Sequence, residues 1–293
     1  MKGLRWNTGQ SIKSASGDYY KIIQLLGEGK SATAYLALRT GIEDKGTFHV
    51  VKLMQHPDSS AKLENFNQEK ELIRKFDHAS VISISDSGEY ESAGIKFPFY
   101  ISDFYSSTLA SVIKQSSLKL TRKISYAIQL CSALSHLASR SIIHCDVKPD
   151  NIYVDGLNCV LADFGLAVNV NGDAGVLELP SLHRYRTPDI VEAKKNQTLP
   201  TSKSDVFQLG LVLAELFTGR NPCVVSDSGS DEVHIDTLPK VHGRFGKNID
   251  AIIDSMLQID PQKRPSSDKL IEKWEKVLFK AYEYMLKVDK DVY

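Results

Sequence analysis

The chain has 293 residues, of which 42% are hydrophobic and 25% are charged, so it can bury a sizeable core without disulfides or metal ions. Its 36 basic and 36 acidic residues cancel, which gives no indication of a nucleic-acid partner or an anionic-membrane partner. The polar first residues lack the apolar core of a signal peptide, and no window has the apolar length of a membrane anchor. Four cysteines without a C-x-x-C pair indicate buried thiols and a cytoplasmic location.

The first third of the chain has the pattern of a β-sheet with one helix. Residues 1–18 are expected to form a loosely held tail, and residues 19–40 predict two strands around a glycine turn. Further β-rich runs at 48–54, 81–90 and 96–105, with a helical pattern over 61–76, complete this part. We predict a five-stranded antiparallel sheet and one helix over about 19–102.

The remainder of the chain, about 103–290, has mainly helical patterning. Apolar residues recur at helical spacing over 124–137, and the run 204–219 is apolar nearly all round, which is typical of a buried helix that ends at Gly219. Residues 151–165 predict a hairpin that turns at 155–156, and helices are expected over 249–257 and 270–286. The fold class predicted for the whole chain is therefore α+β.

A glycine turn and a strand lysine in the first third indicate a phosphate site. Backbone amides at Gly27, Glu28 and Gly29 can approach phosphate oxygens closely, although ordinary tight turns use the same residues. The strand-like run after this turn argues against a dinucleotide fold, which needs a helix there. Lys52 can hold phosphate oxygens as a point charge, and Glu69 on the following helix can orient it, although each alone is compatible with surface charge.

The strongest signal is the run HCDVKPDN at 144–151 followed by DFG at 163–165, which resembles the protein kinase family of the eukaryotic-like, Hanks-type serine/threonine class. The resemblance implies a two-lobed fold with ATP between the lobes. Asp146 then accepts the proton of the substrate hydroxyl, and Lys148 stabilises the transferring phosphoryl group. Asn151 and Asp163 match the two positions that bind Mg²⁺ or Mn²⁺.

Other parts of the chain extend this resemblance from about residue 20 to residue 265. TPD at 187–189 stands where the family has A-P-E, KSDVF at 203–207 begins its central helix, and DPQKRP at 260–265 matches D-P-x-x-R-P. The resemblance implies ion pairs between Lys52 and Glu69 and between Asp189 and Arg264. It also implies the ATP-binding set, with a serine as gatekeeper, formed by Gly27, Glu28, Gly29, Ala34, Val50, Lys52, Glu69, Ser102, Asp103 and Tyr153.

Two departures from the family concern the ATP-binding residues. The last glycine of the loop is Ala32, which limits flexing of the loop without blocking phosphate contact. The residues expected on one face of adenine are Ala34 and Val50, where the family has valine and alanine in these places. The summed volume is unchanged, and volume-conserving swaps are tolerated, which favours a retained adenine slot.

Two further departures concern catalysis and its control. Cys145 replaces the arginine before the catalytic aspartate, so the chain is of the non-RD type, and Leu182 replaces an expected threonine. A thiol cannot dock a phosphorylated loop as a guanidinium does. We therefore expect turnover without phosphorylation of Ser181. The expectation is the same if Cys145 is merely a small buried residue tolerated by packing.

The interpretation that accounts for most of these motifs is a serine/threonine kinase acting on a protein substrate, with serine or threonine favoured by Lys148. One alternative is a pseudokinase that binds nucleotide or acts as a scaffold, although such proteins commonly lose charged residues that this chain keeps. A second alternative is a small-molecule kinase of related fold, which typically lacks the lysine and the DFG glycine found here. The oligomeric state and the substrate identity stay open.

Overall fold

A computed structural model of the chain describes residues 4–29, 31–41, 46–115, 118–171, 184–224, 233–238 and 240–290. The chain forms two compact units, Met1–Tyr105 and Ser106–Tyr293. None of the helices in the described ranges has both the length and the apolar character that a membrane crossing requires.

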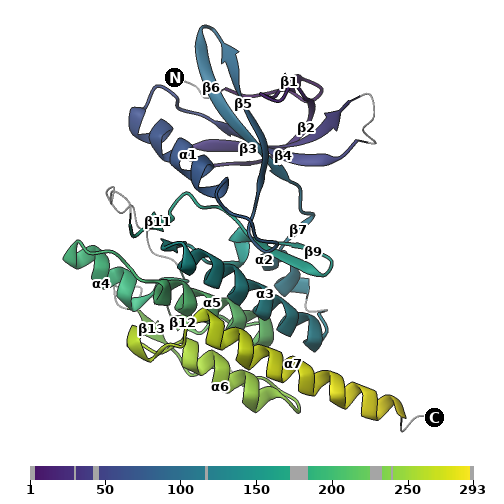
Figure 1. Cartoon of the computed structure of the whole chain (residues 1–293), viewed down its shortest axis with the longest axis vertical. Coiled ribbons are helices and arrows are strands. Elements are labelled where there is room, and N and C mark those ends of the chain that lie inside the picture. The colour runs from purple at the N-terminus through teal and green to yellow at the C-terminus, as the bar shows by residue number, and fades with distance from the viewer. Residues whose placement is uncertain are drawn as a thin grey trace. The chain divides into compact units, whose positions relative to one another are not determined.

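The first unit contains one antiparallel sheet with the strand order β1-β2-β3-β4-β6-β5 (Figure 1). Its elements are β1 Ser11–Lys13, β2 Tyr19–Glu28, β3 Ala32–Thr40, β4 Phe48–Met54, α1 Ser60–Ile73, β5 Ile84–Ser92 and β6 Ile95–Asp103. The predicted sheet with one helix is confirmed. The predicted number of five strands is wrong, because the segment expected to be a tail supplies a sixth strand, β1.

Two apolar side chains explain why this N-terminal segment is ordered. Trp6 is buried beside Tyr35, Tyr90 and Phe99, with ring centroids 5.3, 5.5 and 5.8 Å away. Ile12 in β1 lies opposite Tyr20 of β2 and is also buried. The polar composition of residues 1–18 concealed these two anchors, whose burial removes large apolar surfaces from water.

The register of β3, β4 and β6 separates the two faces of the sheet. Side chains alternate along a strand, and directly paired residues of antiparallel strands point to the same face. Tyr35, Val51 and Ile101 therefore share one face, which packs against Trp6 and Ile12 in a single apolar cluster. The opposite face carries four of the positions predicted to bind ATP, namely Ala34, Val50, Lys52 and Ser102.

The second unit is mainly helical, with short strand pairs (Figure 1). Its helices are α2 Leu109–Gln115, α3 Leu120–Ser139, α4 Pro188–Asn196, α5 Ser202–Thr218, α6 Gly246–Met256 and α7 Ser267–Lys290, with 3-10 turns η1 Pro149–Asn151 and η2 Pro261–Lys263. Its strands are β7 Ser107–Thr108, β8 Ile142–Ile143, β9 Ile152–Asp155, β10 Asn158–Leu161, β11 Val168–Asn169, β12 Cys223–Val224 and β13 His234–Ile235.

Helix α5 lies at the centre of this unit and is buried along most of its length, as its apolar sequence predicts. It packs against α3 and α6, while α7 runs along α3 (Figure 1). The helix ends at Gly219, whose φ of 78° suits a residue without a Cβ atom. The predicted β9–β10 hairpin is also confirmed, and the Ala162 N–H just after it donates to the Asn151 carbonyl over 2.9 Å.

Candidate active site

The glycine turn joins β2 directly to β3, so no helix follows it, as the sequence predicts. Gly27 and Gly29 are exposed, and the Gly29 N–H donates to the Ala32 carbonyl over 2.9 Å. A Cβ atom at Gly29 would lie 3.3 Å from that oxygen, which is a tight contact with backbone. Glycine therefore fits a turn whose backbone must pass close to itself.

Lys52 and Glu69 form an ion pair within the first unit, which confirms the predicted pairing. The Lys52 Nζ lies 2.7 Å from the Glu69 Oε1, and the same oxygen accepts the hydroxyl of Tyr100 over 3.1 Å. Tyr100 was missed from the sequence, although it is the strand partner of Lys52 across β4 and β6. The Glu69 side chain is 6% exposed and that of Lys52 is 25% exposed, so the carboxylate is fixed and the ammonium group reaches solvent.

Three of the other predicted ATP-binding residues, Ala34, Val50 and Ser102, lie on the same face of the sheet as Lys52. Ala34 pairs with Lys52, and Val50 pairs with Ser102, whose small side chain is buried. Asp103 is the last residue of β6 and its side chain is exposed. Its Oδ1 lies 4.0 Å from the Nδ1 of His49. Tyr153 belongs to β9 of the second unit. The assignment of these residues to ATP stays a prediction.

The catalytic motif folds so that two side chains converge on the carboxylate of Asp146. The Lys148 Nζ lies 2.6 Å from the Asp146 Oδ2, and the Asn151 Nδ2 donates to the same oxygen over 2.8 Å. Asn151 also donates to the Asp146 carbonyl over 2.9 Å. These contacts fix the rotamer of Asp146 through its Oδ2, and the prediction that its Oδ1 accepts a proton from a hydroxyl group is compatible with this arrangement.

His144 supports this arrangement from a fully buried position. Its Nε2 lies 3.1 Å from the Ala162 carbonyl and its Nδ1 accepts the Asp146 N–H over 3.3 Å, which assigns the proton to Nε2. Burial lowers the pKa of His144, in agreement with a neutral ring. The ring also contacts Phe164 edge-on, with 4.7 Å between centroids, so DFG is anchored to the catalytic segment.

Asp205 on helix α5 holds the backbone of this segment, a role that the sequence did not predict although the KSDVF motif includes this residue. Its two carboxylate oxygens accept the N–H groups of His144 and Cys145 over 2.8 and 2.9 Å. Burial raises the pKa of Asp205 to about 7, against the two backbone hydrogen bonds, which lower it. Cys145 has a φ of 64°, a conformation that a non-glycine residue adopts only where its surroundings impose it. The contact from α5 supplies that constraint.

Asn151 and Asp163 offer oxygen atoms to a divalent cation. Because the Nδ2 of Asn151 faces Asp146, its Oδ1 is the atom left for a metal. Asp163 is exposed and has a φ of 64°, whereas Phe164, which follows it, is buried. Mg²⁺ prefers oxygen ligands and commonly takes one or two from the protein and the rest from phosphates and water. These two residues fit such an ion.

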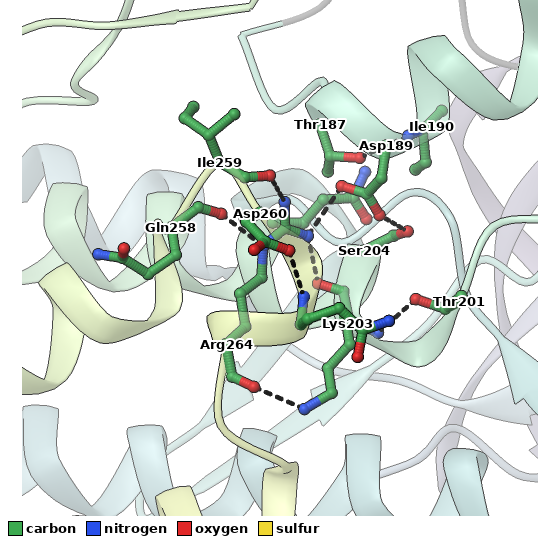
Figure 2. A network of polar contacts seen from close by, with 12 residues as sticks. Thr187, Asp189, Ile190, Thr201, Lys203, Ser204, Gln258, Ile259, Asp260 and Arg264 are labelled. Atoms are coloured by element: carbon green, nitrogen blue, oxygen red, sulfur yellow. Dashed lines mark hydrogen bonds and ion pairs between the residues drawn. The ribbon is translucent and has the colours of Figure 1, made fainter.

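Arg264 lies at the centre of a polar network beneath helix α4 (Figure 2). Its Nη1 contacts the Asp189 Oδ1 over 2.8 Å, which confirms the predicted pair, and also donates to the Lys203 carbonyl. The Nε and Nη2 groups donate to the carbonyls of Gln258 and Ile259. Ser204, which the sequence did not indicate, donates to the second oxygen of Asp189. This network is structural, because the Arg264 side chain is 0% exposed.

Two positions used in the sequence predictions, Ser181 and Leu182, lie outside the described residues. The described residues resume at 184, and Arg184 and Tyr185 form hydrogen bonds with other residues of the second unit. The Tyr185 hydroxyl donates to Glu215 of α5, and the Asn221 Nδ2 donates to the Arg184 carbonyl over 3.1 Å. Thr187 then caps the N-terminus of α4, where its Oγ1 accepts the Ile190 N–H over 3.1 Å.

Comparison with known proteins agrees with this geometry. The family model described as protein kinase domain matches residues 20–274. The chain is 28% identical over 280 residues to the probable serine/threonine-protein kinase nek3 of Dictyostelium discoideum, covering 87% of this chain and 23% of that protein. Serine/threonine-protein kinases PrkC of Bacillus subtilis and PknB of Mycobacterium leprae are 29% and 26% identical, over 69% and 84% of this chain. The match spans 31% and 41% of those two proteins, so the chain covers less than half the length of these relatives.

Proposed function

Because the chain belongs to the protein kinase family, we propose that it transfers the γ-phosphate of ATP to serine or threonine hydroxyls of a protein substrate. The observation that carries this proposal is the convergence of Lys148 and Asn151 on one oxygen of Asp146. A general base must be held in one rotamer near the proton that it accepts, and this contact pattern does so. The two bacterial relatives, PrkC and PknB, and the D-x-K-x-x-N spacing favour serine or threonine over tyrosine.

The residues divide into three roles in this proposal. Asp146 accepts the proton of the attacking hydroxyl, and Lys148 stabilises the charge that develops on the phosphoryl group. Asn151 and Asp163 hold Mg²⁺, which would neutralise the phosphates when bound. Lys52, aimed by Glu69, binds phosphate oxygens of ATP, and the glycine turn supplies backbone N–H groups.

We also propose that the enzyme is of the non-RD type. It would act without phosphorylation of its activation segment, which is the part of the sequence from Asp163 to Asp189. Cys145 is buried and offers no guanidinium group for a phosphate. The catalytic segment receives its order from Asp205 instead, through the N–H groups of His144 and Cys145. Treatment with a phosphatase should leave the initial rate unchanged. A rate that collapses, and returns on rephosphorylation, contradicts this part of the proposal.

A cytoplasmic location fits the thiols of the chain. Cys131, Cys145, Cys159 and Cys223 are all buried and none forms a disulfide. Burial raises the pKa of each thiol, which disfavours the reactive thiolate. Such cysteines are compatible with a reducing compartment, and fractionation of cells that express the full protein would test this location.

The test of the proposed function is phosphate transfer from γ-labelled ATP with Mg²⁺ to casein, followed by identification of the phosphorylated amino acid. We expect labelled serine or threonine, and a rate that falls by about 10²–10⁴-fold in Asp146→Asn. The control is Asp155→Asn, at an exposed position of the β9–β10 hairpin. Binding of ATP without any transfer would instead support a pseudokinase. Transfer to aminoglycosides or choline but never to protein would support a small-molecule kinase.

A further inference from the structure

Gln208 is a buried polar residue in the middle of helix α5, within a run of apolar side chains. Its carboxamide makes three contacts, all with backbone of other segments. The Oε1 accepts the Val147 N–H over 2.9 Å, and the Nε2 donates to the carbonyls of Cys145 and Tyr185 over 3.0 and 3.1 Å. One donor group and two acceptor groups as partners allow only one orientation of the carboxamide.

These contacts join two segments that are distant in the sequence. Cys145 and Val147 flank Asp146 on either side, so Gln208 grips the backbone around the proposed catalytic base. Tyr185 belongs to the segment that leads into α4. A single side chain on a rigid helix therefore fixes the position of the base relative to the residues before α4.

Asp205 and Gln208 are three residues apart on α5 and so project from one side of the helix. Asp205 binds the N–H groups of His144 and Cys145, whereas Gln208 binds the carbonyl of Cys145 and the N–H of Val147. Together the two side chains satisfy four backbone groups around Asp146. Only Gln208 extends this contact to Tyr185.

We infer that Gln208 is a positioning residue that aligns Asp146 with the segment before α4, in place of order supplied by a phosphate and an arginine. This inference rests on the proposed function for its effect on rate. A displacement of about 1 Å in a catalytic group can cost about 100-fold in rate, so loss of these contacts acts on the transfer step. Binding of ATP, which we assign largely to the first unit, stays unchanged.

The first test is Gln208→Met, which keeps the length of the side chain and removes its polar atoms. We expect kcat to fall by about 10- to 100-fold while KM for ATP changes less than about threefold. The fold should survive, because Tyr185 and Arg184 keep their contacts with Glu215 and Asn221. The matched control is Gln262→Met, at an exposed glutamine of the same unit. A kcat within threefold of the unmodified protein would overturn the inference.

The second test is Gln208→Glu, which keeps the acceptor but removes the donor when the introduced carboxyl group is ionised. Burial raises the pKa of such a group, and its protonated form regains one donor. The kcat relative to that of the unmodified protein should therefore rise by about fivefold or more from pH 8 to pH 6. Asp205 on the same helix and Cys145, Asp146, Lys148 and Tyr185 in the facing segments are present in both proteins. The ratio therefore reports the new carboxyl group together with its coupling to Asp205. A flat ratio contradicts the inference.

The third test needs no catalysis and separates this inference from the proposed function. Hydrogen exchange in Gln208→Met should rise by about fivefold or more in peptides covering 144–148 and 184–187, with residues 4–105 unchanged. The same measurement on Gln208→Glu at pH 8 replaces it if the methionine variant does not fold. Unchanged exchange in these peptides overturns the inference. Faster exchange in a protein that never transfers phosphate supports it and rejects the proposed function alone.

Discussion

The two ion pairs predicted from the sequence have nearly equal lengths but different surroundings. Lys52–Glu69 spans 2.7 Å with a lysine that is 25% exposed, whereas Arg264–Asp189 spans 2.8 Å with an arginine that is 0% exposed. Arg264 uses its Nε and both terminal nitrogens on neighbouring oxygen atoms (Figure 2). Length therefore does not distinguish the pair that we assign to ATP binding from the pair that serves the fold. Exposure and the surrounding contacts do.

The largest expected effect is on the buried pair. Arg264→Ala should lower the free energy of unfolding by about 3–5 kcal/mol, because it leaves the Asp189 carboxylate and several carbonyls without their partner. Equilibrium unfolding in urea measures this. The control Lys263→Ala changes a side chain that is 70% exposed and should cost under about 0.5 kcal/mol. Nearly equal losses for the two variants would show that the network is not structural.

The partly exposed pair should respond in activity. Lys52→Met should lower the transfer rate by about 10²–10³-fold, as expected when a charge on the transferring phosphates is removed. The free energy of unfolding should fall by about 1 kcal/mol or less, since the Tyr100 hydroxyl still donates to Glu69. The control is Lys96→Met, whose exposed lysine pairs with Glu89. Near wild-type activity in Lys52→Met would show that the assignment of Lys52 is wrong.

A smaller effect is expected at the second oxygen of Asp189. Ser204→Ala removes the hydroxyl that donates to it and should cost about 1–3 kcal/mol, because a carboxylate that is only 13% exposed then lacks one hydrogen bond. Unfolding in urea gives the value. Ser255→Ala, which removes a partly exposed hydroxyl, is the control and should cost about 0.5 kcal/mol or less. If Ser204→Ala has no effect, Arg264 alone is enough to hold Asp189.

The smallest effect is expected at Tyr100. Tyr100→Phe removes one of two donors to Glu69 and should cost about 0.5–1.5 kcal/mol in the free energy of unfolding. The same change should cost about 1 kcal/mol more in the Lys52→Met background, where the hydroxyl is the remaining donor of the two. A double-mutant cycle measures this coupling. Strict additivity would mean that Tyr100 and Lys52 do not share the carboxylate.

Residue patterns and the family resemblance determined several features of this protein. The alternation in the strands and the apolar run of α5 predicted the fold class, and the resemblance carried by the HCDVKPDN and DFG motifs implied the catalytic segment and the two ion pairs. These features depend on contacts within one segment or on a motif with a fixed order, so the linear sequence contains them. The N-terminal segment was misjudged because two anchors, Trp6 and Ile12, stand among polar residues.

Only the tertiary structure decided how the polar residues of α5 are used. The sequence shows Ser204, Asp205 and Gln208 in an apolar helix but not their partners, which are Asp189, the backbone around Asp146 and the Tyr185 carbonyl. A buried polar group must find a hydrogen bond, but the group that provides it comes from whichever distant segment the fold brings near. Backbone partners also have no residue-type signature. The sequence therefore determined which residues carry the proposed chemistry, and the tertiary structure decided what holds them in place.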